Sequence, residues 1–288
     1  MKVLIATDGS NDANTAIITA LRLLRSDDLS VDVLCVAPEL VPASRVGCSE
    51  REGKQTLLAT ERLLHREGLT PHVRLKTGSP VNVIAKAASD YDLVVVGAHG
   101  KHERTQPGLG PVSAALVENV RGSLMVGREL TNDKAFRVLV ALDTSEASFN
   151  ALQALPALVD ARAIEVTLMH VIELPWARLD LPQEWPEFEP DASEISDYQR
   201  DLENELNRAA DQVIIRARDF LEARDISVTE IVAEGDPGLE LVSHAEEGGY
   251  DLIVAGATGS SDVKHALLGS VSSKLAWNAP CSVLVVRS

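Results

Sequence analysis

The chain carries one pattern of apolar segments and glycines twice, and this internal repeat limits its fold more than any other feature. Short apolar runs of the kind that form buried strands alternate with longer amphipathic stretches, first over residues 1–130 and again over residues 136–288. Three glycines of the first half recur at one constant spacing in the second. The matched pairs are Gly97 with Gly256, Gly100 with Gly259, and Gly110 with Gly269. We therefore predict a duplicated unit that forms two similar domains.

Strands that alternate with helices predict an α/β fold in each half, with parallel sheets covered by helices on both faces. Five strands are expected in each half. They cover residues 2–6, 31–36, 73–76, 92–96 and 124–126, and then residues 136–142, 166–171, 228–233, 252–255 and 283–286. Only 3% of the residues are aromatic, so both cores are expected to be aliphatic. The short polar linker 129–135 should keep the two domains in contact.

The composition argues against several classes of partner. The net charge is −16 at pH 7, whereas DNA, RNA and anionic membranes require a basic face. No apolar run approaches the roughly 18 residues that a membrane-spanning helix needs. The chain enters its first strand at once, without a leader segment, so we expect a cytoplasmic protein. Cys35 and Cys281 lie in or beside strand-like runs, which favours buried thiols over disulfide bonds.

The segment 252–273 has the features of a phosphate-binding loop. An apolar run ends at Gly256, Gly259 follows, and Gly269-Ser270 stands directly before a helical segment. Glycine lets the backbone approach a ligand closely, and the free N–H groups at a helix start favour an anion. Ser270 and Ser272 add hydroxyl donors. The segment is not a P-loop, because no Gly-Lys-Ser/Thr follows the glycines. A tight turn before a capped helix would account for the spacing equally well.

The spacing Gly-x2-Gly-x9-Gly-Ser resembles the ATP-binding signature of the universal stress protein family. Three further features carry the resemblance. They are the strand-Asp starts at residues 6–10 (Ala-Thr-Asp-Gly-Ser) and 141–145 (Ala-Leu-Asp-Thr-Ser), the repeated glycine turn, and the closing strand 280–286 (Pro-Cys-Ser-Val-Leu-Val-Val). The whole chain is therefore similar to a tandem universal stress protein. The resemblance implies two flavodoxin-like (adenine-nucleotide alpha hydrolase-like) domains, each an open five-stranded parallel sheet with helices on both faces. It also implies pairing of the two domains through their fifth strands.

The resemblance implies an ATP site in the second half, with or without magnesium. Asp143 would accept hydrogen bonds from the adenine or the ribose, and Val171 would flank the base. The phosphates would be held through backbone N–H groups and a hydroxyl. These groups belong to Gly256, Gly259, Gly269, Ser270, Val271 and Ser272. From the residues alone, Asp143 could also be a helix cap or a turn residue, and Val171 a core residue.

The first half departs from the family pattern at its phosphate end. Gly110 is followed by Pro111, where the family has Ser or Thr, and proline has neither an N–H nor a hydroxyl. We therefore expect residues 1–130 to form a domain with a degenerate nucleotide motif, and residues 136–288 to form a domain with an intact one. A different ligand in the first domain stays open.

No catalytic or metal-binding set is identifiable in the sequence. His99 and His102 lie three residues apart, but no third metal ligand accompanies them. No lysine is expected at the phosphates, and Asp262 and Lys264 are the charged residues nearest to the glycine loop. An enzyme is therefore not favoured, although slow ATP hydrolysis remains an alternative.

The largest asymmetry between the halves is the segment 174–198. It contains four prolines, two tryptophans and many acidic residues, and we expect it to precede the long helix of the second half as a loop. The leading interpretation is a stress-response regulator that binds ATP in its second domain. It would act on an unknown regulatory protein through domain packing or oligomerisation, and we expect a homodimer. The alternative is a nucleotide-free scaffold that binds a protein or an apolar ligand through residues 174–198.

Overall fold

The structure is a computed structural model of the chain. It describes residues 1–24, 29–38, 50–101, 108–128, 136–158, 164–174, 192–259 and 268–287. The linker 129–135, Cys48, and residues 175–191 of the long insertion lie outside the described residues.

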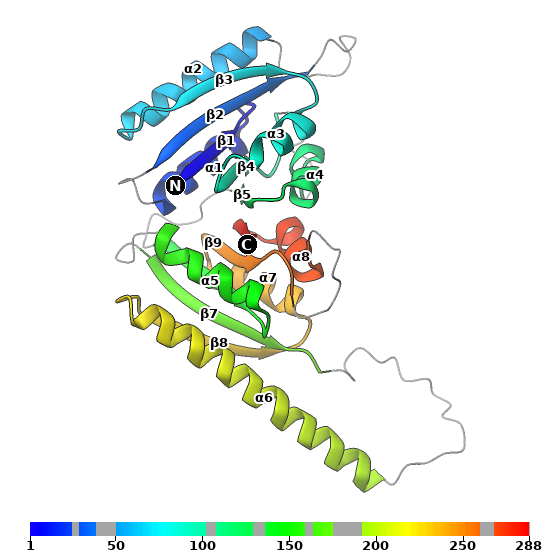
Figure 1. Ribbon diagram of the computed structural model, residues 1–288. Coiled ribbons are helices and arrows are strands. Elements are labelled where there is room, and N and C mark those ends of the chain that lie inside the picture. Colours follow the sequence, from blue (N-terminus) through cyan, green and yellow to red (C-terminus); the bar gives the residue numbers. More distant parts are fainter. Residues whose placement is uncertain are drawn as a thin grey trace, which may run out of the picture.

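Two halves of the same design are stacked along the long axis of the molecule (Figure 1). The first half contains β1 (Lys2–Ala6), α1 (Asn11–Leu23), β2 (Ser30–Ala37), α2 (Glu50–Arg66), β3 (His72–Thr77), α3 (Pro80–Ala88), β4 (Leu93–Gly97), α4 (Pro111–Asn119) and β5 (Ser123–Gly127). The second half contains β6 (Phe136–Leu142), α5 (Glu146–Leu158), β7 (Ile164–Ile172), α6 (Ala192–Glu222), β8 (Val228–Glu234), α7 (Pro237–Gly248), β9 (Leu252–Gly256), α8 (Ser270–Asn278) and β10 (Ser282–Val286). The predicted α/β class and duplication are confirmed.

All ten strands belong to one sheet, in the order β3-β2-β1-β4-β5-β10-β9-β6-β7-β8. Within each half the strands are parallel, and the order reverses between β1 and β4 and between β6 and β9. The halves meet where β5 pairs antiparallel with β10, with Val126 opposite Val283. The predicted pairing through the fifth strands is therefore confirmed, and it gives the two halves one continuous sheet.

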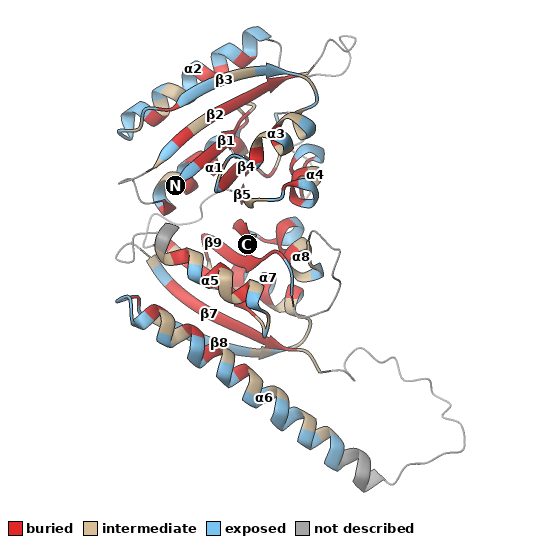
Figure 2. Cartoon of the chain, in the orientation of Figure 1, coloured by how far each residue is buried: buried red, intermediate tan, exposed pale blue. Residues whose placement is uncertain are grey.

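The helices divide the core into three parts. On one face of the sheet, α1, α2, α5 and α6 cover a single apolar core that runs through both halves, with Ile17, Leu64, Leu152 and Leu221 fully buried. On the other face, α3 and α4 cover a core of the first half, and α7 and α8 cover one of the second. Figure 2 shows the central strands buried along their length, while the edge strands β3 and β8 are partly exposed.

Two reciprocal arginines tie the halves together beside the β5–β10 pair. The guanidinium of Arg128, which follows β5, donates to the carbonyl oxygens of Ala276 and Cys281, at the end of α8 and just beyond it. Arg287, which follows β10, donates in the same way to the carbonyl oxygen of Val117 in α4, at 2.7 Å. The last carbonyl groups of a helix have no partner within it, so each half supplies the partner that the other half lacks.

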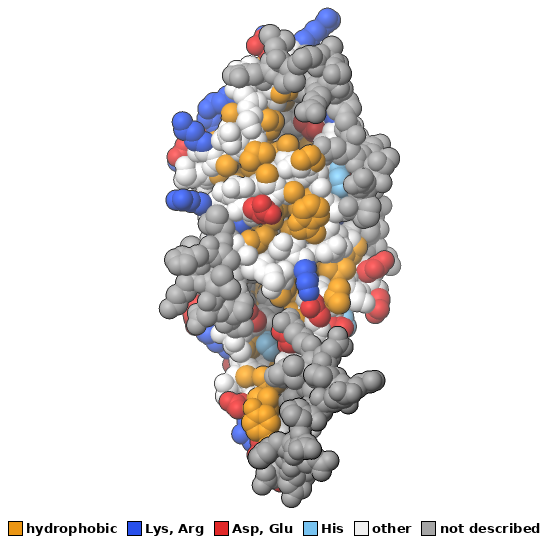
Figure 3. Space-filling view, turned by 90° about the vertical axis from the view of Figure 1, so that its right-hand side faces the viewer, with side chains coloured by type: hydrophobic (Ala, Val, Ile, Leu, Met, Phe, Trp, Pro, Cys, Tyr) orange, Lys and Arg blue, Asp and Glu red, His pale blue; other side chains and the backbone are white. Residues whose placement is uncertain are grey.

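Helices α4 and α8 also meet across this junction. Gly108, at φ +111°, lies against the Trp277 ring, and a Cβ on Gly108 would come within 2.9 Å of that ring. Figure 3 shows the face that carries α4 and α8, where apolar side chains gather near the middle of the molecule. Val112 and Trp277 are among the exposed apolar residues of these helices. The halves are thus packed through helices as well as through the sheet.

The long insertion is shorter than its sequence indicates. Helix α6 begins at Ala192, so residues 192–198, which we expected in a loop, form the first turns of this helix. Tyr198, Leu202 and Leu206 continue one helical spacing along the chain, and helix α6 extends beyond the edge of the sheet (Figure 1). Residues 175–191, which hold both tryptophans of the insertion, lie outside the described residues.

The two described cysteines are buried thiols without disulfide bonds, as predicted. Burial raises the pKa of the Cys281 thiol to about 12. Because the thiolate is the reactive form, we expect iodoacetamide at pH 8 to label Cys281 at least about a hundredfold more slowly in the native protein than in the unfolded chain. Peptide mass spectrometry with and without guanidinium measures this ratio. Equal labelling in both states would contradict the burial of Cys281.

No helix in the described part of the chain is long and apolar enough to cross a membrane.

Candidate functional site

A cavity of about 380 Å³ lies at the carboxyl ends of β6 and β9, where the strand order of the second half reverses. Open α/β sheets bind their ligands at this place. Every site residue named from the sequence lines the cavity. These residues are Asp143, Val171, Gly256, Gly259, Gly269, Ser270, Val271 and Ser272. The fold therefore brings together groups from three strand ends and one helix start.

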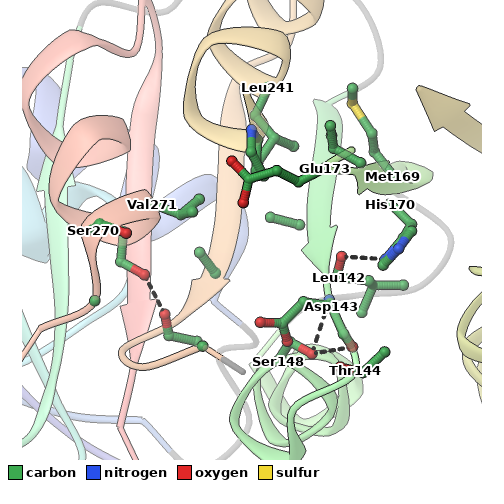
Figure 4. Close-up of a pocket in the computed structure, with 18 of the residues that line it drawn as sticks. Leu142, Asp143, Thr144, Ser148, Met169, His170, Glu173, Leu241, Ser270 and Val271 are labelled. Carbon is green, nitrogen blue, oxygen red and sulfur yellow. Dashed lines mark hydrogen bonds between the residues drawn. The ribbon is translucent and has the colours of Figure 1, made fainter. Parts of the chain in front are cut away.

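Asp143 follows β6 and directs its two carboxylate oxygens differently. Oδ1 accepts hydrogen bonds from the backbone N–H of Ser145, at 2.9 Å, and from the Ser145 hydroxyl. Oδ2 lies 2.9 Å from the position that a Cβ on Gly259 would take. Asp143 is thus a turn residue through one oxygen, and the other faces the glycine loop. Figure 4 shows Asp143 and Ser148 on one side of the cavity, with Ser270 and Val271 across it.

The end of β7 forms an apolar wall with one polar edge. Val171 is buried beside Met169, and both line the cavity. His170 Nδ1 lies 2.9 Å from the carbonyl oxygen of Leu142, which can only accept, so this nitrogen carries the proton (Figure 4). Burial lowers the pKa of His170, so the ring is neutral at pH 7. His170 is therefore a packed residue that also borders the cavity.

The start of α8 forms the opposite end of the cavity. Gly269 is its N-cap and has no side chain to bind the first N–H groups of the helix. The N–H of Gly269 itself donates to Ala257 O at 2.6 Å. The N–H groups of Ser270 and Val271 belong to the first turn, which has no carbonyl partners within the helix. This helix start can therefore receive an anion.

Packing against the described residues does not require glycine at position 269. Its φ is −74°, which any residue adopts, and a Cβ there would approach its nearest described neighbours no closer than 3.4 Å. Gly256 is different, because a Cβ would lie 2.7 Å from the backbone of Ala147 in α5. Gly256 therefore allows the close approach of a helix to the sheet, whereas Gly269 leaves space in the cavity.

The hydroxyl of Ser272 is used inside the protein. Ser272 is buried and its Oγ donates to Gly256 O at 2.5 Å. The matching Ser113 of the first half donates to Ala98 O, one residue beyond the end of β4. In place of the expected hydroxyl donor to a ligand, the structure shows a bond that ties α8 to the end of β9.

Sequence reasoning missed a charged pair at the cavity. Lys274 lines it from α8, and its Nζ lies 2.6 Å from Oδ2 of Asp236, the N-cap of α7. The hydrogen bond from Lys274 lowers the pKa of Asp236. We expected no lysine at this site, yet Lys274 lines the cavity. Lys274 lies one helical turn beyond Ser270, and this spacing could have revealed it. Asp262 and Lys264 lie outside the described residues.

No group of three or more metal-ligating side chains occurs in the described part of the chain. His99 forms a pair with Asp12, whose Oδ2 lies 2.9 Å from His99 Nδ1, and His102 lies outside the described residues.

The three-layered halves, the strand order and the glycine loop at the reversal point define a duplicated adenine-nucleotide alpha hydrolase-like α/β protein. The sequence model of the Universal stress protein family matches residues 1–128 and again residues 135–287. The chain therefore belongs to the universal stress protein family and is a tandem member of it. The family name links the chain to the stress response.

Individual relatives agree with this assignment. A universal stress protein of Mycolicibacterium smegmatis is 24% identical over 303 residues, covering 99% of this chain and 96% of the relative. The protein YxiE of Bacillus subtilis is 30% identical over 154 residues, covering 52% of this chain and 98% of the relative. Among solved structures, a universal stress protein of Archaeoglobus fulgidus has a TM-score of 0.66 at 19% identity, covering 99% of this chain and 98% of that one. This last likeness supports the fold.

Proposed function

We propose that this protein is a stress-response regulator that binds ATP in the cavity of its second half. One observation carries the proposal. The N-terminus of α8, with no side-chain cap at Gly269, opens onto a cavity whose other end holds Asp143 and Val171. Phosphates require hydrogen-bond donors, the adenine or the ribose requires an acceptor, and the face of the base requires an apolar wall.

The size and charge of the cavity support the same ligand. Its volume of about 380 Å³ lies within the roughly 300–1,000 Å³ of small-molecule sites. Lys274 adds a cation on the helix that would hold the phosphates, and Asp236 holds its ammonium group near the cavity. Magnesium would enter with the phosphates, because this ion is commonly bound by phosphate oxygens, water and one or two carboxylates.

The site has a direct structural connection to the first half. The phosphates would meet the beginning of α8, and Arg128 of the first half holds its end. A ligand that stabilises the position of α8 would therefore also favour the observed packing of the two halves. This connection supports signalling through domain packing.

Calorimetric titration of ATP into the wild type and into Ser270→Pro tests the site. The wild type is expected to bind about one ATP per chain, and the variant about a hundredfold more weakly, since it loses one N–H and one hydroxyl donor to a charged ligand. The helix should tolerate proline, because Pro111 already occupies the matching position after Gly110, whose ψ of 162° is close to the 160° of Gly269. Ser270→Ala keeps the N–H and should lose only about tenfold.

Two other results would carry different meanings. Unchanged affinity in Ser270→Pro would contradict the placement of the phosphates at α8. Absence of ATP binding to the wild type would contradict the proposed function itself. Phosphate release, measured in the same samples, separates binding from slow hydrolysis.

A further inference from the structure

The first half contains a second cavity of about 320 Å³, at the carboxyl ends of β1 and β4. It occupies the place that corresponds to the cavity of the second half, because the strand order of both halves is the same. We expected the nucleotide motif of this half to be degenerate, yet the space beside it is open. Residues that correspond in the two halves can therefore be compared one by one.

The end of the first cavity that would face a base is retained. Asp8 matches Asp143, and Val36 matches Val171, each at the end of the corresponding strand. The turn is similar, since Asp8 Oδ1 accepts from the N–H of Ser10 at 2.8 Å, and Asp8 Oδ2 accepts from the N–H of Lys101 at 3.0 Å. Each carboxylate oxygen has a second lone pair, so Asp8 can still accept from a ligand. Leu34 and Ile84 extend the apolar wall. The acceptor and the wall that we assign to base and ribose recognition are both present here.

The end that would face phosphates has lost its donors. Pro111 stands at the first position of α4, where α8 has Ser270, so one N–H and one hydroxyl are missing. Ala115 stands where α8 has Lys274, so the cation of that helix is missing as well. The hydroxyl of Ser113 donates to Ala98 O inside the protein. These changes remove much of the attraction for a phosphate chain.

The charged groups in the described lining of this cavity do not replace the lost donors on α4. Asp8, Glu52, His99 and Lys101 are the titratable residues among its described lining. The His99 ring is paired with Asp12. The Nζ of Lys101 lies beside Gly9, 3.3 Å from the position that a Cβ there would take, near α2. Glu52 stands where α6 has Ala209, judged by the shared buried positions of the two helices, and it adds a negative charge at the rim.

We propose that the first cavity binds an uncharged nucleoside, that is, a base and a sugar without phosphate. The proposal rests on the proposed function, because it assigns to Asp8 and Val36 the roles of their counterparts in the second half. Asp8 accepts hydrogen bonds from the ligand, and Val36 and Leu34 flank the base. The start of α4, with Pro111 in place of Ser270, has fewer donors for phosphates than the start of α8. The protein would then respond to a nucleoside in one half and a nucleotide in the other.

Adenosine is the probe for this site. Calorimetric titration of adenosine into protein already saturated with ATP is expected to show one further equivalent per chain. Asp8→Asn should weaken this adenosine binding at least about tenfold, since a charged acceptor is lost. The same variant should bind ATP as the wild type does, which also shows that it folds.

The outcomes separate the two proposals. If ATP-saturated protein binds no further equivalent of adenosine, the inference is overturned, and the proposed ATP site is unaffected. Two equivalents of ATP, one of them lost in Asp8→Asn, also overturn it, because the first cavity would then accept phosphates. A wild type that binds no ATP contradicts the proposed function, and in that protein adenosine binding that depends on Asp8 would still support a nucleoside site.

Discussion

Gly269→Leu is expected to weaken ATP binding at least about a thousandfold, or about 4 kcal/mol, while the protein remains folded. A Cβ at position 269 would point toward Ala257, Thr258 and Gly259, and its contacts with them would be 3.4–3.5 Å. The backbone therefore accepts a side chain, but the added leucine would fill the space between the glycine loop and the start of α8. Replacing glycine at an N-cap should cost no more than about 1 kcal/mol of unfolding free energy. Calorimetry and urea unfolding measure the two quantities.

Gly256→Leu is the matched control for this prediction. A Cβ there would lie 2.7 Å from the carbonyl carbon of Ala147, and backbone atoms cannot move aside cheaply. We expect this variant to unfold or to lose several kcal/mol, because overpacking displaces α5 from the sheet. If Gly269→Leu bound ATP normally, the position of the phosphates would be wrong. If it unfolded instead, our conclusion that packing does not require glycine at 269 would be wrong.

Arg128→Met is expected to lower the free energy of unfolding by about 2–4 kcal/mol. The half-buried guanidinium of Arg128 donates to carbonyl oxygens at the end of α8 and just beyond it, and methionine would leave these oxygens without that donor. Burial also lowers the pKa of Arg128, so the cost of removing the guanidinium from water offsets part of the stability that its hydrogen bonds provide. We therefore expect the loss of unfolding free energy to lie near the lower end of this range. Urea unfolding followed by circular dichroism measures it.

Arg287→Met is the reciprocal variant for this prediction, and Arg200→Met is its control. Arg287 makes the reciprocal contacts to Val117 O and Gly122 O, so its replacement should cost a similar amount. Arg200 is exposed and pairs with Asp197 at the helix surface, so its replacement should change stability by less than about 0.5 kcal/mol. If Arg128→Met lowered the free energy of unfolding no more than Arg200→Met does, the hydrogen bonds of Arg128 to the other half would not stabilise the junction.

Local patterns in the sequence were sufficient for much of the fold. The period of apolar residues and the paired glycines predicted the order of strands and helices. These signals act within a few residues, where backbone geometry and side-chain spacing decide the outcome. The same reasoning placed the start of α6 too late, because the composition of residues 174–198 resembles a loop although its last part is helical.

Tertiary structure decided which of these residues work together. Gly256 allows the close approach of α5, whereas Gly269 leaves a cavity open. This difference follows from the residues that surround each glycine in the fold. The Lys274–Asp236 pair joins two helices, and the Arg128 cap joins two halves. The sequence alone determined that this chain is a duplicated α/β protein with a glycine loop in each half. Only the folded chain decided that Asp143, Val171, Lys274 and the start of α8 line one cavity, because such contacts depend on where distant segments meet rather than on their own spacing.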